Sequence, residues 1–355
     1  MGLLSTTAPD EKELAMTLVD RPGAATDTGV PRTSAAPRPG PPPLTENQRG
    51  PATVWAVVAV VWIVVAVQAV VRWVLSDDFA PAPVLGPDQM AAWHLVALRI
   101  FEVASIGVLV FFLWVAVINP IRKTGKLSLD GKFVLGGLVA FVGDAFLNSQ
   151  HLLFAWNANN INTGVWTRFL PFHDVASSSR YAESVIWGAP MYVYFCAGVA
   201  MMAGPMVRRL RLRNPAITTV KLFAAVWLFD FMFDLVLENV IIRLTQGYAY
   251  AQSFGPLTLW AGAWYQFPVY ESILVASLGS VYTWMRTMAQ DHPQGLCPAE
   301  RGFERFPEGL QTTVRTLAVI GLCSAATLLV DHLPFNWLGL AGGATAHLPS
   351  FMLPG

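Results

Sequence analysis

The sequence predicts an all-α protein, a polytopic membrane helical bundle with about seven transmembrane helices. Of the 355 residues, 54% are hydrophobic and only 13% are charged, and the mean hydropathy is +0.47. An ordinary soluble domain of this length is less apolar. Two further observations agree with this fold class. Apolar runs of about 20 residues recur along the chain, each long enough to cross a bilayer, and Lys and Arg gather in alternate connections.

Residues 1–50 are predicted to be a disordered cytoplasmic tail. They are rich in Pro, Gly, Ala, Ser and Thr and show no apolar period that could build a core. The tail also lacks the basic region followed at once by an apolar region that a signal peptide has. We therefore expect the first apolar run to be retained as a membrane span.

The helical bundle is expected over residues 51–340, with a short C-terminal tail at 341–355. The seven predicted spans lie at roughly 52–75, 93–118, 133–156, 184–206, 216–242, 267–286 and 313–333. No repeat of fixed period is visible along the chain. The pattern therefore indicates neither a solenoid nor an inverted-repeat transporter.

Basic residues follow the second, fourth and sixth predicted spans, whereas the opposite connections are poor in Lys and Arg. The basic set is Arg122, Lys123, Lys126, Lys132, Arg208, Arg209, Arg211, Arg213, Arg286, Arg301 and Arg305. By the positive-inside rule, the N-terminus is predicted to be cytoplasmic and the C-terminus to lie outside. The expected location is the cell membrane, as a multi-pass protein whose partner is the lipid bilayer.

Charge and cysteine content exclude other classes of function. The formal net charge is zero and no long basic run occurs, so no nucleic-acid partner is expected. Cys196, Cys297 and Cys323 are widely spaced, which predicts neither a disulfide framework nor a zinc site. The sequence assigns no oligomeric state.

The fifth predicted span carries a row of acids. Asp230, Asp234 and Glu238 fall at i, i+4 and i+8, so they lie on one face of a helix that is otherwise apolar. Ionisable groups inside a membrane are costly and indicate a functional site. We therefore predict these acids to be catalytic. The alternative interpretation is structural: one or two of them pair with basic residues to lock helices together, the candidates being Arg243, Arg99 and Arg180.

Polar residues of three other spans are expected in the same outer half of the bundle. Asp144 and Glu271, which opens the sixth span, join the predicted catalytic set. Asn148 and His151 follow Asp144 at helical spacing in the third span, and Glu183 begins the fourth. We assign these three to substrate binding. His151 alone is also compatible with a metal ligand or with a hydrogen-bonded structural residue.

Two outer connections, residues 154–175 and 247–268, are rich in aromatic and amide side chains. Such composition suits a lid over a site, and it also suits an aromatic belt at the membrane surface without a ligand role. On the lid interpretation, further substrate-binding candidates come from these connections and from the fifth span. They are Trp156, Asn157, Trp166, Trp227, Tyr248, Tyr250, Trp264 and Tyr265.

A cluster of carboxyl groups in an apolar cavity can act as a general acid and base pair, because one member keeps its proton while a neighbour is ionised. This chemistry suits dehydration or cyclisation of a lipophilic substrate, and it needs no metal and no organic cofactor. Two alternatives stay open. Asp230 and Asp234 resemble the aspartate motifs of UbiA-type prenyltransferases and cyclases, which hold Mg²⁺ against a diphosphate. The third hypothesis is a transporter or accessory membrane protein whose acids relay protons.

Three stretches resemble a known family. They are GDAFLNSQHLLFAWNANNINTGVW at 143–166, WLFDFMFDLVLENVIIRLTQGYAYA at 227–251 and YQFPVYE at 265–271. Together they are similar to the AveC-type membrane spirocyclases, over about residues 90–290. The resemblance implies an enzyme that dehydrates a polyketide hydroxy-ketone or cyclises it to a spiroketal without an organic cofactor. It transfers no residue roles, so the site residues above rest on the pattern alone.

Overall fold

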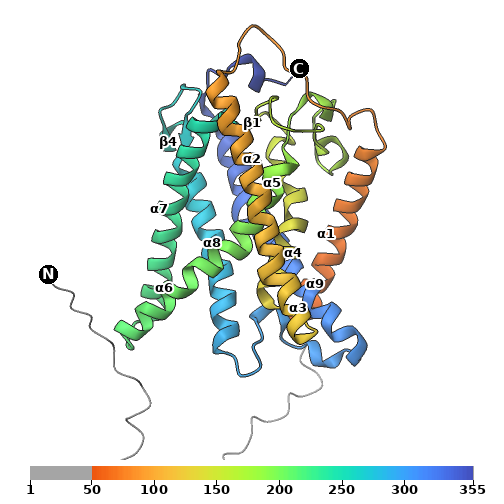
Figure 1. Cartoon of the computed structure of the whole chain (residues 1–355), viewed down its shortest axis with the longest axis vertical. Coiled ribbons are helices and arrows are strands. Elements are labelled where there is room, and N and C mark those ends of the chain that lie inside the picture. Colours follow the sequence, from red (N-terminus) through yellow and green to blue (C-terminus); the bar gives the residue numbers. More distant parts are fainter. Residues whose placement is uncertain (1–49, 355) are drawn as a thin grey trace, which may run out of the picture. The chain divides into compact units, whose positions relative to one another are not determined.

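The computed structural model describes residues 50–354, so the predicted tail at 1–50 lies outside the described residues apart from Gly50. The described part is mostly helical, as predicted, and its helices join into continuous segments (Figure 1). In chain order they are α1 (Pro51–Val74); α2 (Ala92–Phe112), η1 (Leu113–Ile118) and α3 (Asn119–Thr124); α4 (Leu129–Ala140) and η2 (Phe141–Asn148); α5 (Val185–Val193), η5 (Tyr194–Gly198) and α6 (Val199–Arg213); α7 (Thr219–Thr245); α8 (Val269–Asp291); and α9 (Glu308–Ala326), η9 (Thr327–His332) and α10 (Leu333–Ala341).

Four helical segments within residues 50–354 are long and apolar enough to cross a membrane. They are Pro51–Val74, Ala92–Thr124, Val185–Arg213 and Glu308–Ala341. Helices α7 and α8 are also long, but each carries several charged side chains. The chain is therefore a helical membrane protein, while the count of seven spans and the cytoplasmic N-terminus stay predictions.

Local sequence explains where several helices begin and bend. The side chains of Ser128 and Thr218 accept hydrogen bonds from the backbone at the starts of α4 and α7. Pro190 lies inside α5, where it removes one backbone hydrogen bond, and the helix then widens into the π-helical η5. The segments η1 and η9 are π-helical as well. Such bulges inside α-helices frequently occur at functional sites.

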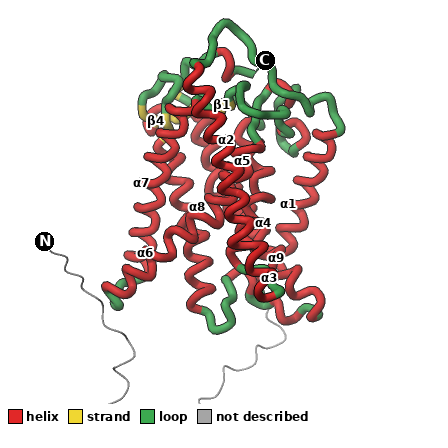
Figure 2. The backbone as a smooth tube through the Cα atoms, viewed as in Figure 1, coloured by secondary structure: helices red, strands yellow, loops and turns green. Residues whose placement is uncertain are grey.

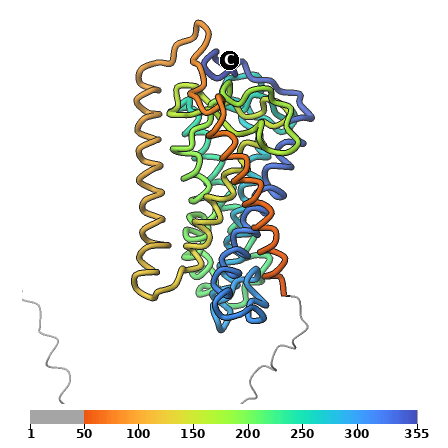
Figure 3. Tube along the Cα trace, turned by 90° about the vertical axis from the view of Figure 1, so that its right-hand side faces the viewer, coloured from red at the N-terminus to blue at the C-terminus, as the bar shows by residue number. Residues whose placement is uncertain are grey.

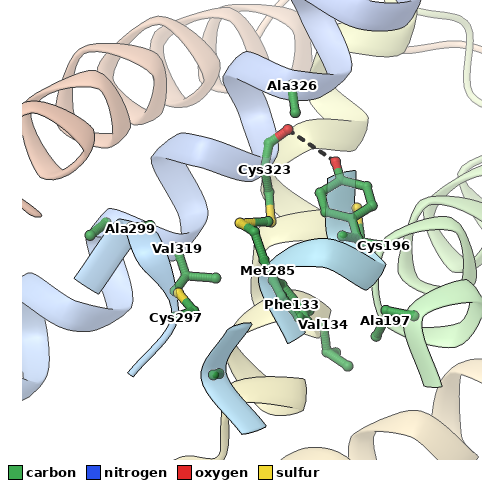
Figure 4. Packing of buried hydrophobic residues seen from close by; sticks show 14 of the residues in the cluster. Phe133, Val134, Cys196, Ala197, Met285, Cys297, Ala299, Val319, Cys323 and Ala326 are labelled. Carbon is green, nitrogen blue, oxygen red and sulfur yellow. Dashed lines mark hydrogen bonds between the residues drawn. The ribbon is translucent and has the colours of Figure 1, made fainter. Parts of the chain in front are cut away.

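The core lies where α4 packs against α5 and α9, with α1 on the other side of α9. A Cβ at Gly321 in α9 would lie 2.0 Å from the backbone oxygen of Trp55, so only glycine allows α1 to approach this closely. Figure 4 shows the packing around Cys323 and Met285, which Phe133 of α4 joins. The second half of the bundle is formed by α7, which packs against α8 and α2, and by α6 against α8.

Loops and short strands gather at one end of the bundle (Figure 2). The strands form three antiparallel pairs: β1 (Phe154–Trp156) with β2 (Tyr248–Tyr250), β3 (Gln252–Phe254) with β6 (Gly343–Thr345), and β4 (Thr258–Leu259) with β5 (Phe267–Pro268). We call this end the strand cap. The pairing of β1 with β2 joins the two predicted lid connections. The segment after α10, predicted only as a short tail, supplies β6 and buries Phe351 and Met352 in the cap.

The third predicted span needs a correction. It was expected to be helical over 133–156, but after Ala140 the helix tightens into the 3₁₀ form of η2 and ends at Asn148. The side chain of Asn148 then bonds the backbone of Leu153 and Phe154, which turns the chain into β1. His151 therefore lies beyond the helix and is exposed, so it does not continue the face of Asp144.

Candidate active site

The acid row of α7 is buried on one face of the helix, as its spacing predicts. Asp230 and Asp234 are each 3% exposed and Glu238 is 9% exposed. Gly279 of α8 faces this row, since a Cβ there would lie 2.8 Å from Oδ2 of Asp230. The missing side chain at Gly279 thus makes room for Asp230 between α7 and α8.

None of these three acids forms an ion pair within residues 50–354. Arg243 instead stacks on the rings of Trp260 and Tyr265, at 4.3 and 4.2 Å from their centroids. Arg99 pairs with Glu102 of its own helix. The alternative of helix-locking pairs with arginine therefore does not hold for the described residues. Buried oxygens of several acids have no hydrogen-bond partner in this part of the chain: Asp230 Oδ1 and Oδ2, Asp234 Oδ2, Glu238 Oε2, Glu271 Oε2 and Glu183 Oε1.

A cavity of about 30 Å³ lies among the helices, and we call it the central cavity. Its carboxyl, phenol and imidazole groups come from five segments: Asp144 of η2, Tyr192 of α5, Glu238 of α7, Glu271 of α8, and Asp331 and His332 of η9. Apolar side chains that include Phe154, Phe195 and Leu278 complete the wall. The fold thus brings together three of the predicted catalytic acids from three different spans.

Two tyrosines of the strand cap hold Glu238. The hydroxyl groups of Tyr248 and Tyr250 donate to Oε1 of Glu238 at 2.9 and 2.5 Å. Burial, and then the charge of Glu238, raise the pKa of both tyrosines, so both keep their protons and remain donors. The β1–β2 pairing and the stacking of Phe154 on Tyr248, 4.8 Å between centroids, fix these rings. Both tyrosines were predicted to bind substrate, and they position a carboxyl group.

Tyr192, Asp331 and His332 were not predicted. The hydroxyl group of Tyr192 donates to Oδ1 of Asp144 at 2.7 Å and lies 2.5 Å from Nε2 of His332. Since a phenol has one proton, Nε2 of His332 carries the hydrogen of the second bond. Asp331 Oδ2 lies 4.0 Å from the same nitrogen. A signal existed for Asp331 and His332, because they are ionisable residues at the end of an apolar run. Tyr192 gave none.

Four predicted substrate-binding residues are used to build the strand cap. The amide group of Asn148 forms the turn before β1, and that of Asn157 donates to the backbone oxygen of Gln246 at 2.8 Å. Trp156 packs on Trp187, with 4.6 Å between centroids. Trp166 donates to the backbone oxygen of Val142 at 2.8 Å, away from the central cavity.

The remaining predicted residues also lie outside the central cavity. Trp227 donates to Ser277, and Tyr265 carries the stacked Arg243. Glu183 is buried two residues before α5. Trp264 borders an open surface cavity of about 470 Å³ in the strand cap. That cavity is larger than the central one, but none of the carboxyl groups without a partner lines it.

Metal binding was the main alternative. Among the described residues, no group of three or more His, Cys, Asp and Glu side chains is arranged to hold a metal ion. Asp230 and Asp234 provide two carboxyl groups, and the cavities beside them are lined by neither Lys nor Arg. A diphosphate would therefore meet no cation from these walls. Mg²⁺ dependence stays a prediction to be tested.

A comparison with models of protein families identifies a family for this chain. A family model described as Spirocyclase AveC-like matches residues 125–348. This match covers more than half of the chain and includes every segment that lines the central cavity, while α1 and α2 lie before it. No curated protein and no solved structure matches the chain.

Proposed function

The chain belongs to the AveC-like spirocyclase family, and from this premise we propose that it is a membrane cyclase that closes a lipophilic hydroxy-ketone into a spiroketal. The observation that carries the proposal is the central cavity. Carboxyl groups of four helical segments face one small space that is lined by no Lys or Arg. Buried charges that serve only structure are usually paired. Groups left without a cation are suited to exchange protons with a bound molecule.

The reaction requires only an acid and a base. One hydroxyl oxygen of the substrate adds to the ketone carbon, and the proton shift that follows gives a hemiketal. A carboxylic acid then protonates the hemiketal hydroxyl group, which leaves as water. The second hydroxyl oxygen bonds to the resulting oxocarbenium carbon, and its proton passes to a carboxylate. One water is released and the enzyme regains its starting proton count.

The cavity offers groups for each role. Glu238 is held in place by two phenol donors, so its second oxygen, which has no partner, is free to exchange a proton with substrate. Glu271 and Asp331 supply further carboxyl groups on the same cavity. Asp144 accepts from the hydroxyl group of Tyr192, which also bonds His332. The rings of Phe154 and Phe195 shield the oxocarbenium ion from water and face it with π-electrons.

A synthetic substrate tests this proposal. The protein is reconstituted in lipid nanodiscs with a ketone that bears on each side a hydroxyl group able to close a six-membered ring. We expect spiroketal formation above the uncatalysed rate, with one stereoisomer in excess, because a shaped cavity fixes the face of attack. Formation of the racemic product at the background rate would contradict the proposal.

Two controls separate the alternatives. Activity that is lost with EDTA and restored by Mg²⁺ would support a diphosphate-dependent enzyme, and activity that survives EDTA supports the acid–base proposal. Proton-coupled flux in liposomes without any product would support a transporter.

A further inference from the structure

The central cavity is one of three that follow the acid row of α7. A second, of about 20 Å³, lies between α2, α5 with η5, and α7, and we call it the α2 cavity. A third, of about 10 Å³, lies between α6, α7 and α8, and we call it the α8 cavity. Glu238 lines the central and α2 cavities, and Asp234 lines the α2 and α8 cavities. Neighbouring cavities therefore share wall residues.

One side chain lines all three cavities. Phe195 belongs to the wall of the central, α2 and α8 cavities. It lies in the π-helical η5, just after Pro190 has interrupted the hydrogen bonding of α5. A water molecule needs about 10–15 Å³ of such volume, so none of the cavities holds a substrate until a wall moves. The Phe195 ring is the wall whose movement would join them.

The outer side of the α2 cavity is apolar. Phe101 of α2 and the α7 residues Phe233, Leu237 and Ile241 line it, and all four are half-buried. The adjoining face of α7 presents Met232, Val236 and Val240 with 48%, 61% and 46% of their surface exposed. Helix α2 stands at the margin of the bundle (Figure 3), and only 17% of its apolar window is buried. In a membrane, this side faces lipid.

The way from the strand cap is closed by aromatic rings. Tyr248 and Tyr250 are fully buried and bonded to Glu238. Trp187 packs between Trp156 and Tyr248, at 4.6 and 5.3 Å between centroids. Opening this route would break these hydrogen bonds and the β1–β2 pairing. A movement of the Phe195 ring would break neither the hydrogen bonds to Glu238 nor the strand pairing.

We propose that a lipophilic substrate reaches the acids from the lipid phase, between α2 and α7, and that the ring of Phe195 is the gate between the α2 cavity and the central cavity. The proposal rests on the proposed function for the nature of the substrate. It implies that the side chain at position 195 sets the width of the molecule that can pass from the α2 cavity to Glu271, which lines only the central cavity of the three.

Carbodiimide labelling tests the route without any turnover. Dicyclohexylcarbodiimide dissolves in lipid, and a carboxylic acid adds across one of its C=N bonds to give an O-acylisourea, which rearranges to a stable N-acylurea. Labelled peptides are identified by mass spectrometry of the full chain in nanodiscs. We expect Glu238 or Asp234 to react faster with this reagent than with a water-soluble carbodiimide. Phe195→Trp should slow the labelling of Glu271, which lies beyond the proposed gate, roughly tenfold, which corresponds to about 1.4 kcal/mol of barrier.

Two further variants make the result decisive. Phe195→Leu removes the ring and should speed the labelling of Glu271, which gives a second test if the tryptophan variant does not fold. Phe229→Trp, on the exposed face of α7, should label like the wild type. Equal labelling by the water-soluble reagent, no labelling by either reagent, or unchanged rates in both Phe195 variants would overturn the proposal. Absence of spiroketal product would instead count against the proposed function alone.

Discussion

The bundle buries two groups of ionisable side chains, one paired with cations and the other not. At the end away from the strand cap, Glu300 of the α8–α9 connection accepts from Lys132 at 2.5 Å and from Arg315 at 2.8 Å. Its second oxygen accepts from the backbone of Cys297 at 3.0 Å. In the central cavity, Glu238 and Glu271 each keep a buried oxygen with no partner and meet no cation among the described residues.

The difference separates a structural use of charge from a chemical one. A buried ion pair whose atoms are all bonded holds its elements in place, and removing one partner leaves an uncompensated charge. Carboxyl groups without cations contribute little to holding helices together, but they can take up and release protons. Substitutions should therefore lower stability in the Glu300 group and lower activity in the cavity.

The largest effect on stability is expected from Lys132→Met. Methionine fills a similar space, but Glu300 then loses its shortest ion pair while remaining buried. Such a loss usually costs about 3–5 kcal/mol. The melting temperature of the detergent-solubilised protein should fall sharply, while turnover per folded molecule stays near that of the wild type. An unchanged melting temperature would contradict the claim that the Lys132–Glu300 ion pair stabilises the fold.

The acids along α7 and at Glu271 should show the reverse. Asp230→Asn, Asp234→Asn and Glu271→Gln keep the shape of each side chain and remove its exchangeable proton. We expect at least one of them to lose on the order of a hundredfold in turnover at unchanged melting temperature. If every loss of activity matched a loss of folded protein, these acids would be structural after all.

A smaller effect is expected at the tyrosine that links two cavity groups. Tyr192→Phe removes the donor to Asp144, and a hydrogen bond to a charged group is worth about 1.5–3 kcal/mol, so turnover should fall roughly tenfold or more. Tyr282→Phe is the matched control, because Tyr282 is equally buried and its hydroxyl group bonds Cys323 and Thr327. Equal loss of turnover in the two variants would show that Tyr192 acts only through packing.

The pH dependence of stability should depend on the Glu300 group. Burial alone would raise the pKa of Glu300, but Lys132 and Arg315 outweigh it and hold the pKa below its ordinary value of 4.5. A carboxyl group with a lowered pKa in the fold contributes stability above its unfolded pKa and loses it as the pH falls through the folded pKa. The melting-temperature gap between wild type and Glu300→Gln should therefore narrow below about pH 4.5. A gap that does not change with pH would contradict this.

Much of the helical architecture could be predicted, because the length of an apolar run and the period of α7 are local properties. The acid row is on one face for the same reason. The end of the third helix could not be predicted, since Asn148 stops it through bonds to residues that follow it. Strands of two or three residues, such as β4 and β1, carry no period at all.

The site was harder to predict than the fold. Asp144, Glu238 and Glu271 could be chosen as candidates because an acid in an apolar run is conspicuous, and the fold brings the three together at one cavity. Asp331 and His332 lie at the end of the last apolar run, so they resemble the polar residues at which a membrane span ends. Tyr192 is an ordinary residue in an apolar helix. Their meeting depends on how α5 and η9 pack against η2, which no local pattern records. The opposite happened with the aromatic residues, which were predicted to bind substrate. Aromatic side chains suit a ligand pocket, but Trp156 and Trp166 pack against other aromatic rings around the strand cap.

The most direct test applies one substitution to both regions. Glu238→Gln and Glu300→Gln each replace a buried carboxyl group with an amide, and glutamine at 238 can still accept from Tyr248 and Tyr250. Spiroketal formation per folded molecule and melting temperature are measured for both variants beside the wild type. We predict that Glu238→Gln melts like the wild type and loses about a hundredfold in turnover, whereas Glu300→Gln melts lower and keeps its turnover. Wild-type turnover in Glu238→Gln, or a loss that only follows the loss of folded protein, would contradict the catalytic role of the central cavity.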